Sequence, residues 1–205
     1  MADRQGRSTP SEESEEKRTE GQVSIRLLKQ RTVLLTGEIN RRSSQRLVAE
    51  LLLLAAEAPK EPIKLFINSP GGDADAGFAI FDVIRFIESP VKAICAGLTA
   101  SAAVIVLLAC PKERRLSLPN ARFLIHQPST GIRGSAADIQ IEASEILKLR
   151  EKGDKLIADE TGQPIEKVKK DTHRNYWMSA SEAKEYGLVG KVISSSTEIR
   201  RPNRG

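Results

Sequence analysis

A nearly unbroken apolar run from Val91 to Cys110, VKAICAGLTASAAVIVLLAC, most constrains what this chain can fold into. Its length is at the short end for a membrane-spanning helix. Lys92 and Gly97 interrupt the run, and Pro111 followed by a charged cluster closes it. Such punctuation is typical of a strand that turns into a helix. We therefore reject a membrane span and predict a buried strand followed by a buried helix.

A single serine, Ser101, lies among alanines at the boundary between the two expected elements. The simplest interpretation is a small helix-start residue. A nucleophile is the alternative, because a helix start has free backbone N–H groups and small neighbours admit a substrate backbone. Gly71 and Gly72 follow another expected buried strand, so their N–H groups could face the same spot.

The rest of the chain alternates between strand and helix patterns. Strands are expected at 31–37, 63–68, 91–97, 114–118 and 121–127, and helices around 47–54, 77–87, after 101 and over 136–160. This alternation predicts an α/β fold with a mostly parallel sheet.

Composition and charge exclude several classes of protein. A chain of 205 residues with 40% hydrophobic and 29% charged residues is expected to form one globular domain. The net charge of +5 is modest and aromatic residues are only 4%, so no nucleic-acid partner is expected. Cys95 and Cys110 match no metal-ligand spacing and are expected to be buried in a reducing compartment, with no metal bound.

The two ends of the chain differ from its middle. Residues 1–20 contain no Val, Leu, Ile or aromatic residue, which predicts a disordered polar tail. The folded domain is expected over 21–194, followed by a loose tail over 195–205. The N-terminus lacks the apolar segment of a signal peptide and carries acidic residues, so a cytoplasmic location is expected.

The expected long helix has apolar residues on more than one side. Ile139, Ile146 and Ile157 share one face, whereas Ile141 and Leu147 lie off it. This pattern favours packing against two neighbours, and a helix central to its own domain is the alternative.

Only two histidines are present as candidate bases. His126 ends the apolar strand ARFLI, where sites of α/β proteins gather. His173 lies among charged residues that are typical of a solvated helix face. A lone histidine is more often structural than catalytic, so residue type alone does not decide between these roles.

Several motifs follow one another in fixed order over roughly residues 26–194: INSPGG, GLTASAA, LPNARFLIHQP, AADIQIEASEILKLRE, TGQPIEKVKKDTHR and MSASEAKEYGLV. Together they resemble the proteolytic subunit of the Clp ATP-dependent protease. The resemblance implies a crotonase-like fold of repeated ββα units with a long handle helix. It also implies heptameric rings stacked as a tetradecamer and fed with unfolded protein by an AAA+ ATPase. ATP would be used by that ATPase, so no cofactor is expected on this chain.

The resemblance assigns roles to individual residues. Ser101 falls at the position of the family's nucleophile, and His126 falls at the position of its base. Gly72 and Ala102 occupy the positions whose backbone N–H groups form the oxyanion hole. The function implied is that of a serine endopeptidase that cleaves unfolded polypeptides into short peptides.

The resemblance also identifies surfaces that contact other subunits. The handle helix corresponds to residues 136–160, and Asp138 and Arg174 match charged positions that help to hold two rings together. ATPase loops would dock in surface pockets lined by aromatics. Phe66 retains one aromatic, but Lys64 and Leu116 replace two others, and a charge in an apolar pocket should weaken docking.

The sequence departs from the family at the third triad position and at the N-terminus. Asn175 replaces the usual aspartate; its amide can orient the histidine but supplies no negative charge. Asp171 could partly substitute, although local pairing is the expected role for its carboxylate. The positions of the family's axial hairpin fall in the polar tail, so no hairpin is expected.

Three alternative functions follow from the same residues. The chain could be a weakly active paralogue that co-assembles with a second proteolytic subunit. A crotonase-type enzyme acting on acyl-CoA would need oxyanion donors but no Ser–His pair. An inactive structural ring subunit would have no reason to retain Ser101 and His126.

Overall fold

The computed structural model describes residues 12–129, 131 and 133–200. The elements in chain order are α1 (Glu12–Lys29), β1 (Thr32–Thr36), α2 (Arg41–Glu57), β2 (Ile63–Ser69), α3 (Ala74–Phe86), β3 (Val91–Ala100), α4 (Ala102–Leu108), η1 (Lys112–Arg114), β4 (Arg115–Ser117), β5 (Arg122–Ile125), α5 (Ala136–Thr161), α6 (Ile165–Thr172), β6 (Tyr176–Ser179), α7 (Ala180–Tyr186), β7 (Lys191–Val192) and α8 (Thr197–Arg200).

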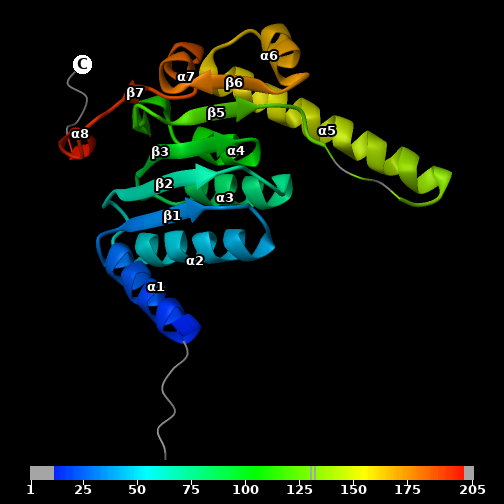
Figure 1. The fold of residues 1–205 in the computed structure, drawn as a ribbon. Helices are drawn as coiled ribbons and strands as arrows, with labels where there is room; N and C mark the ends of the chain where they lie inside the picture. Colours follow the sequence, from blue (N-terminus) through cyan, green and yellow to red (C-terminus); the bar gives the residue numbers. More distant parts are fainter. Residues whose placement is uncertain (1–11, 130, 132, 201–205) are drawn as a thin grey trace, which may run out of the picture.

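The strands form one mixed sheet, as the alternating pattern predicts (Figure 1). Its parallel path runs β1-β2-β3-β4-β7, while β5 pairs in parallel with β3 and antiparallel with β6. Helices α2, α3 and α4 lie next to one another along the sheet (Figure 1). The α/β class is therefore confirmed, with β6 as the antiparallel exception.

Strand β3 changes its pairing partner halfway along its length. Its first half, around Ile94, pairs with β4, and its end, from Leu98 to Ala100, pairs with β5. The change occurs at Gly97, which has φ +81° and lies against the side chain of Asn68. The Asn68 Oδ1 atom accepts a hydrogen bond from the Leu98 N–H at 3.0 Å. This irregularity directs the end of β3 toward β5.

The apolar run from Val91 to Cys110 is a buried strand followed by a buried helix, as predicted. Every residue of α4 except Ile105 is buried, because the helix lies under the sheet and against α3 and α5. Leu47, Leu51 and Leu54 of α2 complete the same core. Within the described part of the chain, no helix is both long and apolar enough to cross a membrane.

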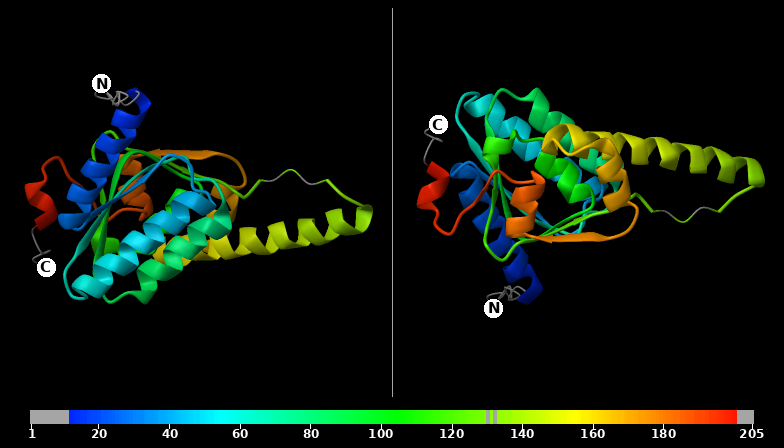
Figure 2. Two further views of the ribbon diagram at one scale, coloured as in Figure 1. Left: turned by 90° about the horizontal axis from the view of Figure 1, so that it is seen from below. Right: turned by 90° about the horizontal axis from the view of Figure 1, so that it is seen from above.

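Helix α5 extends away from the rest of the chain (Figure 2). Ser135 caps its start and Gly162, at φ +78°, ends it. Ile139, Ile141 and Leu147 are exposed on its outer half, whereas its inner half packs against the core. The helix predicted over 136–160 is confirmed, and one chain leaves part of its apolar surface uncovered. Packing of this helix against two neighbours stays a prediction.

The predicted disordered tail over 1–20 is wrong for its second part. Residues 12–20 belong to helix α1, while residues 1–11 lie outside the described part. Leu27 and Leu28 are half-buried near the end of the helix, and Leu28 packs on the core. The charged helix-forming residues ahead of this anchor continue the helix, because propagation costs less than nucleation. A helix, not a hairpin, therefore precedes β1.

The predicted loose tail over 195–205 is also wrong for its first part. Helix α8 returns to the sheet, where Ile199 packs on an apolar cluster. The Lys92 Nζ atom donates to the Ile199 carbonyl at 2.7 Å, and Glu198 pairs with a lysine of β7. The chain beyond α8 lies outside the described residues. One apolar side chain and two polar contacts thus hold a segment whose composition predicts no order.

The two thiols provide a test of the core. Cys95 and Cys110 are fully buried, and burial raises the pKa of each thiol to about 12. Because the thiolate is the reactive form, both should resist a disulfide reagent such as DTNB in the native protein at pH 8. Both should react after unfolding in guanidinium. Rapid native reaction of either thiol would contradict this packing.

Candidate active site

Ser101 lies at a strained turn between β3 and α4. It has φ 55° and ψ −125°, a conformation that a residue with a Cβ rarely adopts and that costs roughly 1–3 kcal/mol. Ser101 is the N-cap of α4, yet its hydroxyl caps no backbone N–H. The simple helix-start interpretation therefore does not account for this serine, since its side chain makes no capping bond.

Gly71 lies against the backbone of this turn. A Cβ at Gly71 would lie 2.5 Å from the Ala100 carbonyl oxygen, 2.7 Å from the Ser101 Cβ and 2.8 Å from the Ala102 nitrogen. Gly71 also has φ +87°, which disfavours other residues. The SPGG turn after β2 is thus packed directly on the strained serine.

Ser101 and His126 line one cavity of about 610 Å³. Ser101 follows β3 and His126 follows β5, which are neighbours in the sheet. Both side chains are half-buried. Residues of α3 and α5 form much of the remaining wall, with Phe78 and Ile157 among the apolar ones and Asp154 among the charged ones. The cavity suits a chain segment whose apolar side chain enters it.

Gly72 and Ala102 line the same cavity and carry backbone N–H groups that are available to a ligand. Ala102 is the first residue of α4, so its N–H has no intrahelical acceptor. Gly72 and Ile39 form an isolated β-bridge, whose hydrogen bonds are made by the two neighbours of Gly72. The Ile39 N–H donates to the Gly71 carbonyl, and the Asp73 N–H donates to the Ile39 carbonyl. The Gly72 N–H is therefore left out of that bridge.

The register of β5 and β6 relates Asn175 to His126. These strands pair antiparallel, with Ile125 opposite Tyr176 at the last step. The ladder ends there, because the next N–H of this strand, that of Gln127, donates to the Thr172 carbonyl; His126 and Asn175 each lie one residue beyond the last pair. Asn175 is exposed, and among the described residues no hydrogen bond joins its amide to His126. Catalytic hydrogen bonds commonly tighten only once substrate is bound.

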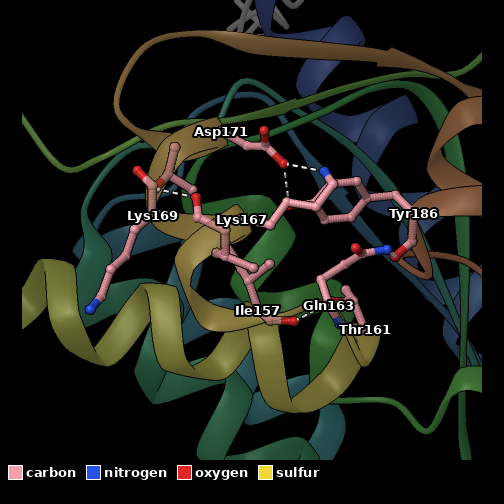
Figure 3. Close-up of polar contacts among 9 residues, drawn as sticks. Ile157, Thr161, Gln163, Lys167, Lys169, Asp171 and Tyr186 are labelled. Atoms are coloured by element: carbon pink, nitrogen blue, oxygen red, sulfur yellow. Dashed lines mark hydrogen bonds and ion pairs between the residues drawn. The ribbon is translucent and has the colours of Figure 1, made fainter.

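Asp171 is paired locally, as expected. Its carboxylate forms an ion pair with Lys167 and accepts a hydrogen bond from the Tyr186 hydroxyl at 3.0 Å (Figure 3). Burial and this carboxylate together raise the pKa of Tyr186. The Asp171 oxygen that makes these contacts faces α7 and not the cavity, so the structure does not bring Asp171 to His126.

Asp138 and Arg174 are both exposed and do not contact each other. Asp138 has a local role that the sequence interpretation missed: it forms a capping box with Ser135 at the start of α5. Hydrogen bonds from the Ser135 hydroxyl and N–H lower the pKa of the carboxyl. An S-x-x-D spacing before a helix is the signal that could have indicated this cap.

The residues of the expected ATPase-docking surface lie around a second apolar cluster. Leu116 and Ile94 are buried in it and Phe66 packs against it, while Lys64 lies on the same strand as Phe66. Ile199 of α8 also packs against this cluster. The chain's own C-terminal segment therefore covers part of the surface on which the resemblance places the docking loops.

Sequence reasoning missed three residues that lie around His126. Gln127 N–H donates to the Thr172 carbonyl at 2.7 Å, and the Thr172 hydroxyl donates to Asp154 at 2.7 Å. Asp154 is a buried acid in the cavity wall. The only hint in the sequence is that a charged residue, Asp154, lies one helical turn before the apolar Ile157 on the long helix.

Comparison with known proteins gives consistent matches along nearly the whole chain. A model of the Clp protease family matches residues 14–196. An ATP-dependent Clp protease proteolytic subunit 2 of Treponema denticola is 52% identical over 85% of this chain and 87% of that protein. A proteolytic subunit 3 of Rhizobium etli is 47% identical over 87% of this chain and 91% of that protein.

A solved structure shows the same fold. It is a ClpP1 from Listeria monocytogenes in which one asparagine is replaced by aspartate, with a TM-score of 0.81 and 43% identity. The match covers 87% of this chain and 99% of that one. The expected crotonase-like architecture is confirmed by this likeness.

The chain belongs to the Clp protease family. Within it, the chain is of the proteolytic-subunit type, and its enzyme class is that of a serine endopeptidase. Family membership implies a ring-assembled complex that works with Clp ATPases.

Gly71→Ala tests the contact beneath Ser101. The added Cβ must displace the backbone at Ala100–Ala102, so we expect peptidase turnover to fall by about 100-fold. Turnover on a fluorogenic peptide and a thermal melt measure the effect. Gly21→Ala is the matched control, since nothing lies within 4 Å of its Cβ. Full turnover in an assembled Gly71→Ala variant would contradict the packing described.

Proposed function

We propose that Ser101 is the nucleophile and His126 is the general base of this peptidase. One observation carries the proposal: a serine held in a strained turn, with an uncapped hydroxyl, shares a cavity with a histidine and two available N–H groups. Strain of this kind is found where a nucleophile is presented on a strand-to-helix turn. The site residues therefore have the three parts that acyl transfer to serine requires.

The reaction follows from this arrangement. The Ser101 Oγ attacks the scissile carbonyl while His126 takes its proton. The oxyanion that forms is stabilised by the N–H groups of Gly72 and Ala102. His126 then returns the proton to the leaving amine, and water hydrolyses the acyl-enzyme by the same path.

Asn175 takes the position of the triad acid in this proposal. Its amide oxygen can accept from the His126 ring and orient it, but a neutral amide gives the imidazolium no charge stabilisation. Asp171 does not supply that charge, because Lys167 and Tyr186 already engage it. We therefore expect a functional triad with reduced turnover.

The assembly that we propose is a tetradecamer of two stacked heptameric rings, homomeric or shared with a paralogous subunit. The exposed apolar outer half of α5 supports contacts between rings, and Asp138 and Arg174 are both exposed, although the Asp138 carboxylate also caps α5. An AAA+ ATPase would supply unfolded polypeptide and hydrolyse ATP, with no cofactor on this chain. The cytoplasmic location stays a prediction.

A weakly active paralogue that co-assembles with a second proteolytic subunit is the alternative form of this function, and the family match does not favour it over the first. Asn175 weakens the triad, and Ile199 covers part of the apolar cluster on which ATPase loops would dock. A subunit with both features gains from a partner ring that recruits the ATPase. A crotonase acting on acyl-CoA and an inactive ring subunit are not favoured by the family match.

Active-site labelling tests the assignment of Ser101. A fluorophosphonate probe should modify the wild type and leave Ser101→Ala unmodified, because only an activated serine attacks the phosphorus. Native mass spectrometry of the labelled species should give seven or fourteen subunits, alone or mixed with a paralogue. Labelling of Ser101→Ala at another serine would refute the nucleophile, and a stable monomer at micromolar concentration would refute the rings.

Asn175→Asp tests the third triad position. A carboxylate there should stabilise the imidazolium and raise turnover by roughly 10- to 100-fold, or about 1.4 to 2.8 kcal/mol. Asn175→Ala should lower turnover, since nothing would then orient the ring. Peptidase kinetics at saturating substrate provide the measurement.

Two controls separate this effect from others. Asp171→Asn should leave turnover nearly unchanged, because its carboxylate contacts α6 and α7 residues instead of His126. The assembly state must be checked for each variant, since Arg174 is adjacent to Asn175. No gain from Asn175→Asp in an assembled ring, or loss of activity in Asp171→Asn, would show that the account of this position is wrong.

A further inference from the structure

A buried carboxylate lies in the wall of the active-site cavity and is not part of the triad. Asp154 of α5 is 4% exposed and lines the cavity that holds Ser101 and His126. A buried carboxylate is costly unless hydrogen bonds or charges compensate it. Its Oδ2 atom is 3.7 Å from the Arg150 Nε, and its Oδ1 accepts from the Thr172 hydroxyl at 2.7 Å.

Thr172 connects this carboxylate to the base. The Thr172 side chain is 1% exposed, so its bond to Asp154 is shielded from water. The Thr172 carbonyl accepts from the Gln127 N–H at 2.7 Å, and the next carbonyl, that of His173, accepts from Gln127 Nε2 at 2.8 Å. Gln127 directly follows His126, so the first bond holds the backbone next to the base and the second holds the Gln127 side chain to the same loop.

The same threonine begins the segment that leads to Asn175. Residues 173–175 connect α6 to β6, and Tyr176 pairs with Ile125. The loop is therefore held at its start by Thr172 and at its end by the strand ladder. The position of His126 relative to Asn175 depends on both attachments, because His126 directly follows β5 and Asn175 lies in the loop that leads into β6.

We propose that Asp154 and Thr172 form a positioning pair that fixes His126 and Asn175 in the geometry for catalysis. Neither residue takes part in proton transfer: each acts through the backbone of Gln127 and of the loop after α6. The proposal rests on the catalytic roles proposed above for His126 and Asn175. It adds a mechanical link between α5 and the catalytic loop, since Asp154 belongs to that helix.

The primary test is Thr172→Val, which keeps the shape of the side chain and removes the hydroxyl. We expect kcat for a fluorogenic peptide to fall by about 10- to 100-fold with little change in KM, since substrate contacts are kept while the base is displaced. The rate of fluorophosphonate labelling should fall in parallel. Thr172→Ser keeps a hydroxyl at this position and should retain most of the wild-type kcat.

Two further variants provide the matched comparison. Thr161→Val removes another buried hydroxyl, one that donates to the Ile157 carbonyl in the last turn of α5 (Figure 3). It should lower the melting temperature to a similar extent without changing kcat. Asp154→Ala removes one acceptor of the Thr172 hydroxyl, whose other close acceptor is the Val168 carbonyl at 2.9 Å. The double variant Asp154→Ala/Thr172→Val should lower kcat no further than the larger single effect, because both changes remove the bond between these two side chains.

The outcomes separate this proposal from the catalytic assignment. Absence of probe labelling in the wild type would refute the proposed nucleophile and base. Labelling of the wild type with unchanged kcat in an assembled Thr172→Val or Asp154→Ala variant would refute the positioning pair alone. Failure of both variants to assemble, or an equal loss of kcat in Thr161→Val, would also refute it, because the pair would then be purely structural.

Discussion

The proposed active site depends on the change of partner that β3 makes at Gly97. One side-chain acceptor, the Asn68 Oδ1 atom, takes the Leu98 N–H at the point where the backbone leaves its first register. Beyond it β3 pairs with β5 instead of β4. Ser101 follows the first of these strands and His126 follows the second. The two side chains meet in one cavity because two neighbouring parallel strands end at the same edge of the sheet.

Helix α5 combines two surfaces on one rigid element. Its inner half forms part of the cavity wall and buries Asp154 and Ile157, whereas its outer half leaves Ile139 and Leu147 exposed. An apolar surface that a single chain leaves uncovered marks a surface for contact with another protein. The helix therefore joins such a surface to the wall of the cavity through side chains that lie a few turns apart.

Much of the fold could be predicted because its pattern is local. The apolar run ending at Cys110, the glycines of the SPGG turn and the spacing of the α2 leucines each reflect the period of one element. The two end segments were mispredicted for the opposite reason. Their composition is polar, and what orders them is a distant contact: Leu28 against the core and Ile199 against the cluster around Leu116.

By itself, the sequence determined the residue types of the proposed site and their order along the chain: a serine at a strand-to-helix boundary, a histidine after a buried strand, and Asn175 where the resemblance places an acid. Only the tertiary structure decided the backbone strain at Ser101, the local pairing of Asp171 and the bond between Asp154 and Thr172. The physical reason is the separation along the chain of the residues that interact. Periodicity and turn chemistry report on neighbours within a few residues, whereas these features arise from elements that meet only after the sheet and its helices have packed together.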